Sequence, residues 1–325
     1  MRLVVPLACL IAFGGCVDET EVSEGTQSVV TDNRIALNRI ALNRIALNRI
    51  ALNRIALNRI ALNNLQANLS SIGNLLDTDE GREVFSFVVS CALDQGITLT
   101  VEHASLGQLL FFGEVGLAPQ WETRAMNDSD QRWVSACLLA RVNNNDVTVQ
   151  VSLRGPTDAL ATTAQERTSW SLQEGAFFGD VFQPGNKPLE MFACRGRDQA
   201  SGPEQGDMDA RDCTEPDPNN PGKTLCGMDF AGDCADFVAP KNNYACEREI
   251  DGYYVNCAET ARFSDDDHTG HGHGHGNGHG HHSHGNGHGY GHHKNGCGGG
   301  HGHGGGHGKG KGNATDEVIT TYLQP

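Results

Sequence analysis

The chain has 325 residues, of which 20% are charged and only 6% are aromatic, and its formal net charge is −16 at pH 7. A chain of this length holds one globular domain or two small ones beside its low-complexity stretches. The negative charge excludes nucleic acid as a partner, because an acidic surface repels the phosphate backbone.

The first 15 residues predict an export signal. Arg2 is followed by an apolar run over residues 3–13 and then by Gly14, Gly15 and Cys16. A charged start, an apolar run of this length and small residues at its end are typical of a secretory signal peptide. The glycines and the cysteine resemble the lipobox of bacterial lipoproteins, which implies that Cys16 becomes the lipidated first residue. An ordinary signal peptide with an incidental Cys16 is the alternative.

Residues 16–32 are polar and acidic, and we expect them to be a tether between the lipid and the folded part. No other stretch reaches the roughly 18 apolar residues that a membrane-spanning helix needs. The expected location is therefore the bacterial cell envelope, at the outer membrane or the surface. The lipid on Cys16 would be the contact with the membrane.

Residues 33–62 are six identical copies of Asn-Arg-Ile-Ala-Leu. On a helix, this period turns successive isoleucines by about 140° and spreads them over every face. On a straight strand, the odd period moves the apolar residues to the opposite side in each copy. The pattern, continued by Ala-Asn-Leu-Ser-Ser at 67–71, resembles pentapeptide-repeat proteins, which implies a short right-handed β-solenoid within residues 33–76. The identity of the copies favours a spacer produced by repeat expansion, and a helix or a partner-binding stalk is a third alternative.

Residues 77–263 carry the patterns of a globular body that mixes helices and strands. We expect an α+β fold over residues 77–193. Residues 194–263 show little periodicity, and we expect disulfides to hold them in place of a large core. The expected helices begin near residue 80 and span residues 130–141, and the expected strands span residues 97–101, 108–115 and 147–153.

Eight cysteines of the body form an even set, as a disulfide framework requires. None belongs to a C-x-x-C motif, which excludes a zinc ribbon and a thioredoxin-type redox pair. We expect Cys91 to pair with Cys137, which would tie the two helices together, and the other six to pair among themselves. The disulfide candidates are Cys91, Cys137, Cys194, Cys213, Cys226, Cys234, Cys246 and Cys257.

Residues 264–316 form a stretch rich in histidine and glycine, and their central part, residues 268–312, holds 14 of the 15 histidines and 21 of the 41 glycines. Such a sequence buries little apolar surface, so it predicts a disordered loop. Neutral imidazole binds Zn²⁺, Cu²⁺ and Ni²⁺, with Cu²⁺ the tightest, and Cys297 adds a soft ligand if it stays reduced. Expansion of a simple codon repeat, without a role in metal binding, is the alternative. The candidate metal ligands are His271, His273, His275, His279, His281, His282, His284, His288, His292, His293, His301, His303 and His307.

Residues 317–325 end the chain with β-branched and aromatic side chains. This composition predicts a strand that docks back on the body. The His/Gly-rich stretch then becomes an inserted loop rather than a tail.

Four phrases of the chain resemble exported proteins of myxobacteria. They are Trp-Val-Ser-Ala-Cys-Leu-Leu-Ala-Arg at 133–141, Ser-Leu-Arg-Gly at 152–155, Glu-Gly-Ala-Phe-Phe-Gly at 174–179 and Glu-Val-Ile-Thr at 317–320. The resemblance covers most of the body but neither of the repetitive segments, and it implies no activity.

The motifs of common catalytic sites are missing from the body. His103 is its only histidine, and the sequence contains no G-x-S-x-G elbow, no H-E-x-x-H and no P-loop. We therefore expect no enzyme and no required cofactor. The sequence favours a lipid-anchored envelope protein whose His/Gly-rich stretch buffers or sequesters transition metal. The alternative is a surface interaction or adhesion protein of unknown partner, in which both repetitive segments are spacers.

Overall fold

The computed structural model describes residues 30–32, 59, 61–72, 75–143, 149–183, 187–201, 211, 213–235, 243–261 and 314–325. Helices and a mixed β-sheet are both present, so the fold is α+β, as the sequence predicts. The predicted signal peptide, nearly all of the pentapeptide repeat and the His/Gly-rich stretch lie outside the described residues.

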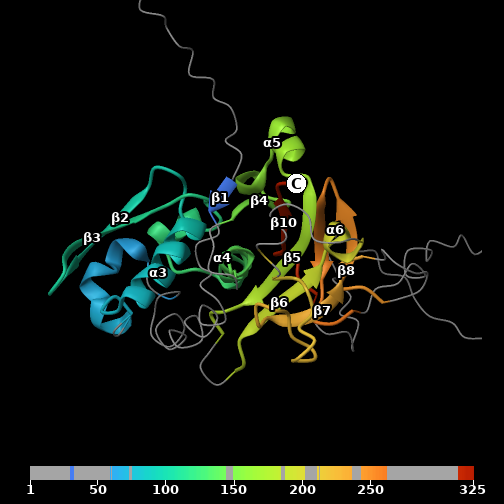
Figure 1. Cartoon of the computed structure of the whole chain (residues 1–325). Helices are drawn as coiled ribbons and strands as arrows, with labels where there is room; N and C mark the ends of the chain where they lie inside the picture. Colours follow the sequence, from blue (N-terminus) through green and yellow to red (C-terminus); the bar gives the residue numbers. More distant parts are fainter. Residues whose placement is uncertain are drawn as a thin grey trace, which may run out of the picture.

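A six-stranded sheet with the order β1-β4-β10-β5-β6-β7 occupies the centre of the fold (Figure 1). Neighbouring strands are antiparallel, except that β6 and β7 are parallel. The segment for which the sequence predicts a closing strand is β10, and it lies between β4 and β5. The strands are β1 (Val30–Asp32), β2 (Thr98–His103), β3 (Gly107–Phe112), β4 (Gln150–Arg154), β5 (Leu172–Asp180), β6 (Glu190–Arg195), β7 (Asp229–Asp233), β8 (Cys246–Ile250), β9 (Tyr253–Cys257) and β10 (Ile319–Leu323).

Two apolar cores cover the two faces of this sheet. On β5, Phe177 belongs to the larger core, which contains the helices, while Phe178 belongs to a smaller core beside the β8–β9 hairpin. Successive strand residues point to opposite faces, so these two phenylalanines place one core on each side of the sheet. The strand is buried from Gln173 to its end because both of its faces are covered.

Two helices lie on one side of the sheet, and both begin at a polar cap. The hydroxyl of Thr78 accepts a hydrogen bond from the backbone N–H of Gly81, and Asn127 and Asp130 form a capping box. Helix α4 packs on β5 and β10, while α3 packs on α4 and β3. The helices are α3 (Asp79–Ala92), α4 (Asp128–Ala140), α5 (Ala164–Ser169) and α6 (Arg197–Ser201), and the 3₁₀ helices are η1 (Leu62–Asn64), η2 (Gln66–Ile72), η3 (Pro119–Glu122) and η4 (Asp158–Leu160).

The β2–β3 hairpin lies beside α3, at the end of the molecule away from β6 to β8 (Figure 1). Its inner face buries Val101 and Phe111, and the Phe111 ring meets the Phe85 ring of α3 edge-on at 4.7 Å. On the outer face, Leu110 is 48% exposed and Phe112 is 61% exposed. The hairpin thus presents apolar side chains to solvent.

The structure joins segments that the sequence analysis treats separately. Val30–Asp32, in the expected tether, pairs with β4 as an edge strand. Leu62 and Leu65, in the expected repeat segment, are buried in the larger core. The boundary expected between residues 193 and 194 falls inside β6, a strand of the main sheet. The α+β part and the disulfide-rich part therefore share one sheet.

A fully buried ion pair lies where these parts meet. The Nε of Arg211 lies 2.8 Å from Oε1 of Glu174 on β5, and both side chains have no exposed surface. Arg211 also donates to the carbonyl of Ala140 at the end of α4. The other carboxylate oxygen of Glu174 accepts a bond from the hydroxyl of Thr321 on β10, and its backbone carbonyl accepts one from the hydroxyl of Thr214. Residues of β10 and of the segment around Arg211 are thus bonded directly to Glu174 on β5, and Arg211 links them to the end of α4.

We predict that Glu174→Gln and Arg211→Met each lower the free energy of unfolding by about 3–5 kcal/mol, because each leaves a buried charge without its partner. The double variant should lose at least about 2 kcal/mol less than the sum of the two single losses. Urea denaturation of the four proteins measures this coupling. The matched control is Glu215→Gln, which breaks a partly exposed pair with Arg195 and should cost at most about 1 kcal/mol. If the loss in the double variant equalled the sum of the two single losses, the two side chains would not be coupled, and the buried ion pair would be wrong.

Candidate functional site

The His/Gly-rich stretch leaves and re-enters the described structure at one point. The N–H of Cys257 donates to the carbonyl of Thr315 over 2.9 Å, and the N–H of Thr315 donates back to the carbonyl of Cys257 over 2.8 Å. We call this pair of bonds the stem. Cys257 ends β9, and Thr315 precedes β10. Residues 262–313, which lie outside the described residues, therefore start and finish on the same part of the body.

Side-chain bonds attach the returning half of the stem to a helix. Glu317 accepts a hydrogen bond from the hydroxyl of Ser129 on α4, over 2.7 Å. Its other oxygen accepts from the hydroxyl of Thr315, and its own N–H donates to that hydroxyl over 3.2 Å. Because these bonds precede β10 directly, the chain enters the central strand from a fixed position.

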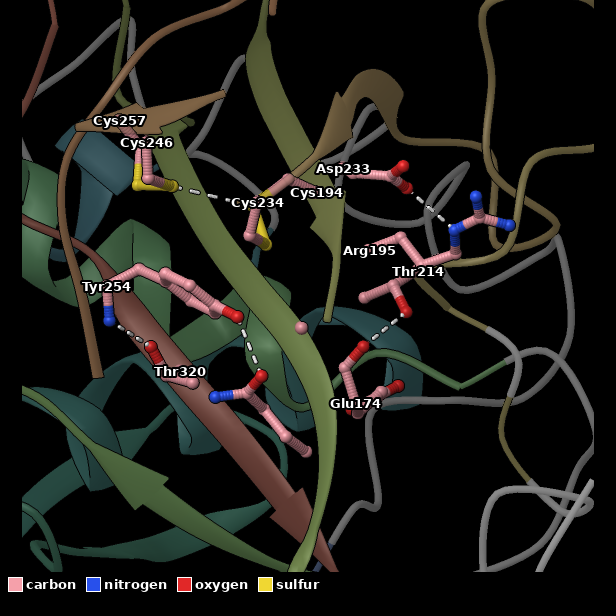
Figure 2. The surroundings of a disulfide bond; sticks show 12 residues. Glu174, Cys194, Arg195, Thr214, Asp233, Cys234, Cys246, Tyr254, Cys257 and Thr320 are labelled. Atoms are coloured by element: carbon pink, nitrogen blue, oxygen red, sulfur yellow. Dashed lines mark hydrogen bonds and ion pairs between the residues drawn. A yellow bond between two sulfur atoms is a disulfide. The ribbon is translucent and has the colours of Figure 1, made fainter. Parts of the chain in front are cut away.

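Two disulfides fix the opposite half of the stem. Cys246 and Cys257 face each other across β8 and β9 and are bonded, and Cys194 of β6 is bonded to Cys234. Figure 2 shows the two disulfides side by side, with the sulfurs of Cys194 and Cys246 only 3.6 Å apart. All four cysteines are buried.

The close sulfurs of this cluster do not make a metal site. The sulfurs of Cys194, Cys234 and Cys246 lie within 4.8 Å of one another, which is close enough for shared ligation. Each of them is already bonded to another sulfur, whereas a metal needs the free thiolate. Elsewhere in the described ranges, no three His, Cys, Asp or Glu side chains come together closely enough to hold an ion.

The other disulfides agree with the sequence-based pairing. Cys91 of α3 is bonded to Cys137 of α4, so the bridge ties the two helices together. Cys213 is bonded to Cys226. The six cysteines from Cys194 to Cys257 therefore pair among themselves, as predicted.

A polar network links the β8–β9 hairpin to the central strand. Tyr254 donates its hydroxyl to the amide oxygen of Gln173 over 2.6 Å, and the amide nitrogen of Gln173 donates to the hydroxyl of Tyr322 over 2.8 Å. The N–H of Tyr254 also donates to the hydroxyl of Thr320 (Figure 2). Burial raises the pKa of both tyrosines, so both stay neutral and act as structural hydrogen-bonding groups.

His103 lies in a constellation that resembles a catalytic triad but has a structural role. Its Nε2 lies 2.9 Å from Oδ1 of Asp77, and its Nδ1 lies 3.3 Å from the hydroxyl of Ser105. The carboxylate of Asp77 selects the tautomer with the proton on Nε2. The lone pair of Nδ1 then accepts the backbone N–H groups of Ser105 and Leu106. A base whose lone pair is engaged in this way stabilises the β2–β3 turn and leaves Ser105 unactivated.

A cavity of about 360 Å³ opens beside the stem, at the end of β5 and β6. Asp180 and Glu190 face each other directly across these strands. Burial, together with the charges of Asp180 and Glu259, raises the pKa of Glu190. The sequence analysis missed this site. The side chains that determine its character are Arg132, Phe178, Lys187, Glu190, Phe192 and Glu259.

Comparison of the chain with protein-family models, curated proteins and solved structures finds no match. The predicted lipidation site Cys16 and the predicted metal ligands between His271 and His307 lie outside the described residues. In the part of the chain that the structure describes, no helix has the length and apolar character needed to cross a membrane. Function must therefore be argued from chemistry.

We predict that peptide mapping of the protein under non-reducing conditions recovers the four disulfides described above. Replacement of Cys91 and Cys137 together by alanine should lower the free energy of unfolding by about 4 kcal/mol, because this bridge closes a loop across 46 positions. The Cys246–Cys257 bridge spans only 11 positions, so its removal should cost about 1 kcal/mol less. Mixed linkages, or an unchanged urea midpoint after loss of Cys91 and Cys137, would disprove the pairing.

Proposed function

We propose that this protein is exported, anchored to the cell envelope by a lipid on Cys16, and binds transition metal through its His/Gly-rich stretch in order to buffer or sequester it. The anchor is supported by the apolar run over residues 3–13 and by the resemblance of the Gly-Gly-Cys sequence to a lipobox. Buried disulfides also support export, because such bonds persist in oxidising compartments.

The observation that carries the metal-binding proposal is the stem at Cys257 and Thr315. The stem fixes the residues on both sides of the stretch to one body, and the 14 histidines of the stretch lie close together in sequence. Several imidazoles can then reach one ion, since glycine offers little steric resistance. No ligand is positioned in advance, so we expect modest affinity for each ion and high capacity.

The body of the protein suits such a role without competing for the ion. Its only histidine, His103, is engaged by Asp77 and by the backbone of its own turn. The eight disulfide cysteines offer no thiolate. The net charge of −16 raises the local concentration of cations near the surface. The His/Gly-rich stretch is therefore the part of the chain whose chemistry suits Zn²⁺, Cu²⁺ or Ni²⁺.

We predict that the mature protein binds several Cu²⁺ or Zn²⁺ ions in isothermal titration calorimetry at pH 7.5. Changing all histidines of residues 268–312 to asparagine should remove this binding without changing the length of the stretch. Binding should also disappear between about pH 7 and pH 5, because protonated imidazole has no lone pair for the ion. The control is His103→Asn, which leaves the stretch intact and should bind as many ions as the unchanged protein.

The biological part of the proposal has its own test. Deletion of residues 268–312 from the chromosomal copy should reduce growth of the producing cell under metal limitation or metal stress, and the asparagine variant should behave like the deletion. If both strains grow like the parent, binding is chemically real but the buffering role is wrong.

A second candidate function, a surface interaction protein, is favoured by the β2–β3 hairpin. The outer face of the hairpin exposes Leu110 and Phe112, together with Leu106 at 48%. Apolar side chains gathered at a protruding end of a protein are a common feature of interaction surfaces. In this case both repetitive segments would serve as spacers.

We predict for this second candidate that the double variant Leu110→Ser, Phe112→Ser reduces retention of the labelled protein on washed cells. Its urea midpoint should stay nearly unchanged, since exposed side chains contribute within about 0.5 kcal/mol to stability. Thr98→Ser is the matched control, because Thr98 is exposed and pairs with Phe112 on the same face. Equal retention of all three proteins would exclude the hairpin as the contact surface.

A further inference from the structure

The cavity beside the stem has the size of a small-molecule site. Its volume of about 360 Å³ lies in the range of pockets that enclose small ligands. The β5–β6 hairpin, α4 and the two halves of the stem all contribute to its lining. The cavity belongs to the folded body, so it is independent of the metal chemistry proposed above.

The cavity is lined by the carboxylates of Glu190 and Glu259. Asp180 lies outside the lining but opposite Glu190 in the antiparallel pairing, and like charges in this position destabilise a sheet. The carboxylate of Asp180 accepts hydrogen bonds from the N–H of Phe182 and from the side chain of Gln183, which partly stabilise its charge. Glu190 and Glu259 form no hydrogen bond or ion pair with another described residue. A positive group inside the cavity would offset this repulsion.

The same cavity also carries two cations. Arg132 of α4 has its nearest carboxylate oxygen, that of Glu317, at 4.0 Å. Lys187 forms no ion pair with another residue in the described ranges. Two groups of each sign thus border one cavity without neutralising each other at close range.

The cavity lining also contains aromatic side chains. Phe178 and Phe192 face each other across β5 and β6, and their rings stack with centroids 5.7 Å apart and planes inclined by 25°. Both rings line the cavity. Phe178 is buried in the smaller core, whereas Phe192 is only partly buried. The Phe192 ring, held in place by Phe178, therefore offers an apolar surface next to the charged groups, which would suit an apolar side chain of a ligand.

We propose that this cavity binds a small zwitterion with an apolar side chain, the chemical class of free α-amino acids. The carboxylates of Glu190 and Glu259 receive the ammonium group, Arg132 and Lys187 receive the carboxylate group, and the side chain lies against Phe192. A simple cation would pair only with Glu190 and Glu259, and a simple anion would pair only with Arg132 and Lys187. A ligand with both charges matches the lining as a whole.

Isothermal titration of the full mature protein with L-leucine and L-phenylalanine tests this site. At least one of them should bind. Leucinamide, which lacks the negative charge, and N-acetyl-leucine, which lacks the positive charge, should bind at least about tenfold more weakly than leucine, because each loses a charge-assisted contact. Glu190→Gln should weaken amino-acid binding by a similar factor.

The variant Glu190→Gln is expected to fold, because it removes a repulsion with Asp180, and its urea midpoint should not fall. The matched control Glu122→Gln changes an exposed carboxylate on η3 and should leave binding unchanged. The proposal is overturned if neither amino acid binds at about 10 mM. It is also overturned if leucinamide or N-acetyl-leucine binds as tightly as leucine, which would indicate a site for one charge only. Titration with Zn²⁺ should give the same result for Glu190→Gln as for the unchanged protein, which separates this site from the His/Gly-rich stretch.

Discussion

The structure depends above all on the buried ion pair between Arg211 and Glu174. Removing two charges from water is costly, and an arrangement of this kind is stable only when both partners and their remaining hydrogen-bonding groups are fixed in place. Here the partners come from β5 and from the disulfide-rich part, while Ala140 and Thr321 add contacts from α4 and β10. The pair therefore fixes the register between parts of the chain that are far apart in sequence.

The sequence predicts those elements whose residues follow a regular period or begin at a recognisable cap. Polar caps at Thr78 and Asn127 mark where helices α3 and α4 begin. The β2–β3 hairpin alternates between its inner and outer faces. By contrast, β5 is buried on both faces, so it lacks the alternation that identifies a strand. The strands β6 to β9 are short and their segment is crossed by disulfides, which leaves little periodic pattern to recognise.

The two candidate sites also differ in how far the sequence predicts them. The metal binding that we propose for residues 268–312 is predicted from composition, because ligation by imidazole groups does not require a particular fold. The cavity cannot be predicted from composition. Glu190 lies opposite Asp180 because of the register of β5 and β6, and it lies in one cavity with Glu259 only because the folded chain brings these distant residues together. The pairing of Cys91 with Cys137 could be predicted without the fold, since each of two expected helices contains one of these cysteines.

The central position of β10 has a consequence for how the protein is made. Residues 319–323 are synthesised after β4 and β5, yet these two strands join into one sheet only through them. Chains usually fold from the N-terminus during synthesis, but here the middle of the sheet stays open until β10 has been made. Strand β10 thus determines when the sheet of the body can close, although it lies more than 130 residues after β5 in the sequence.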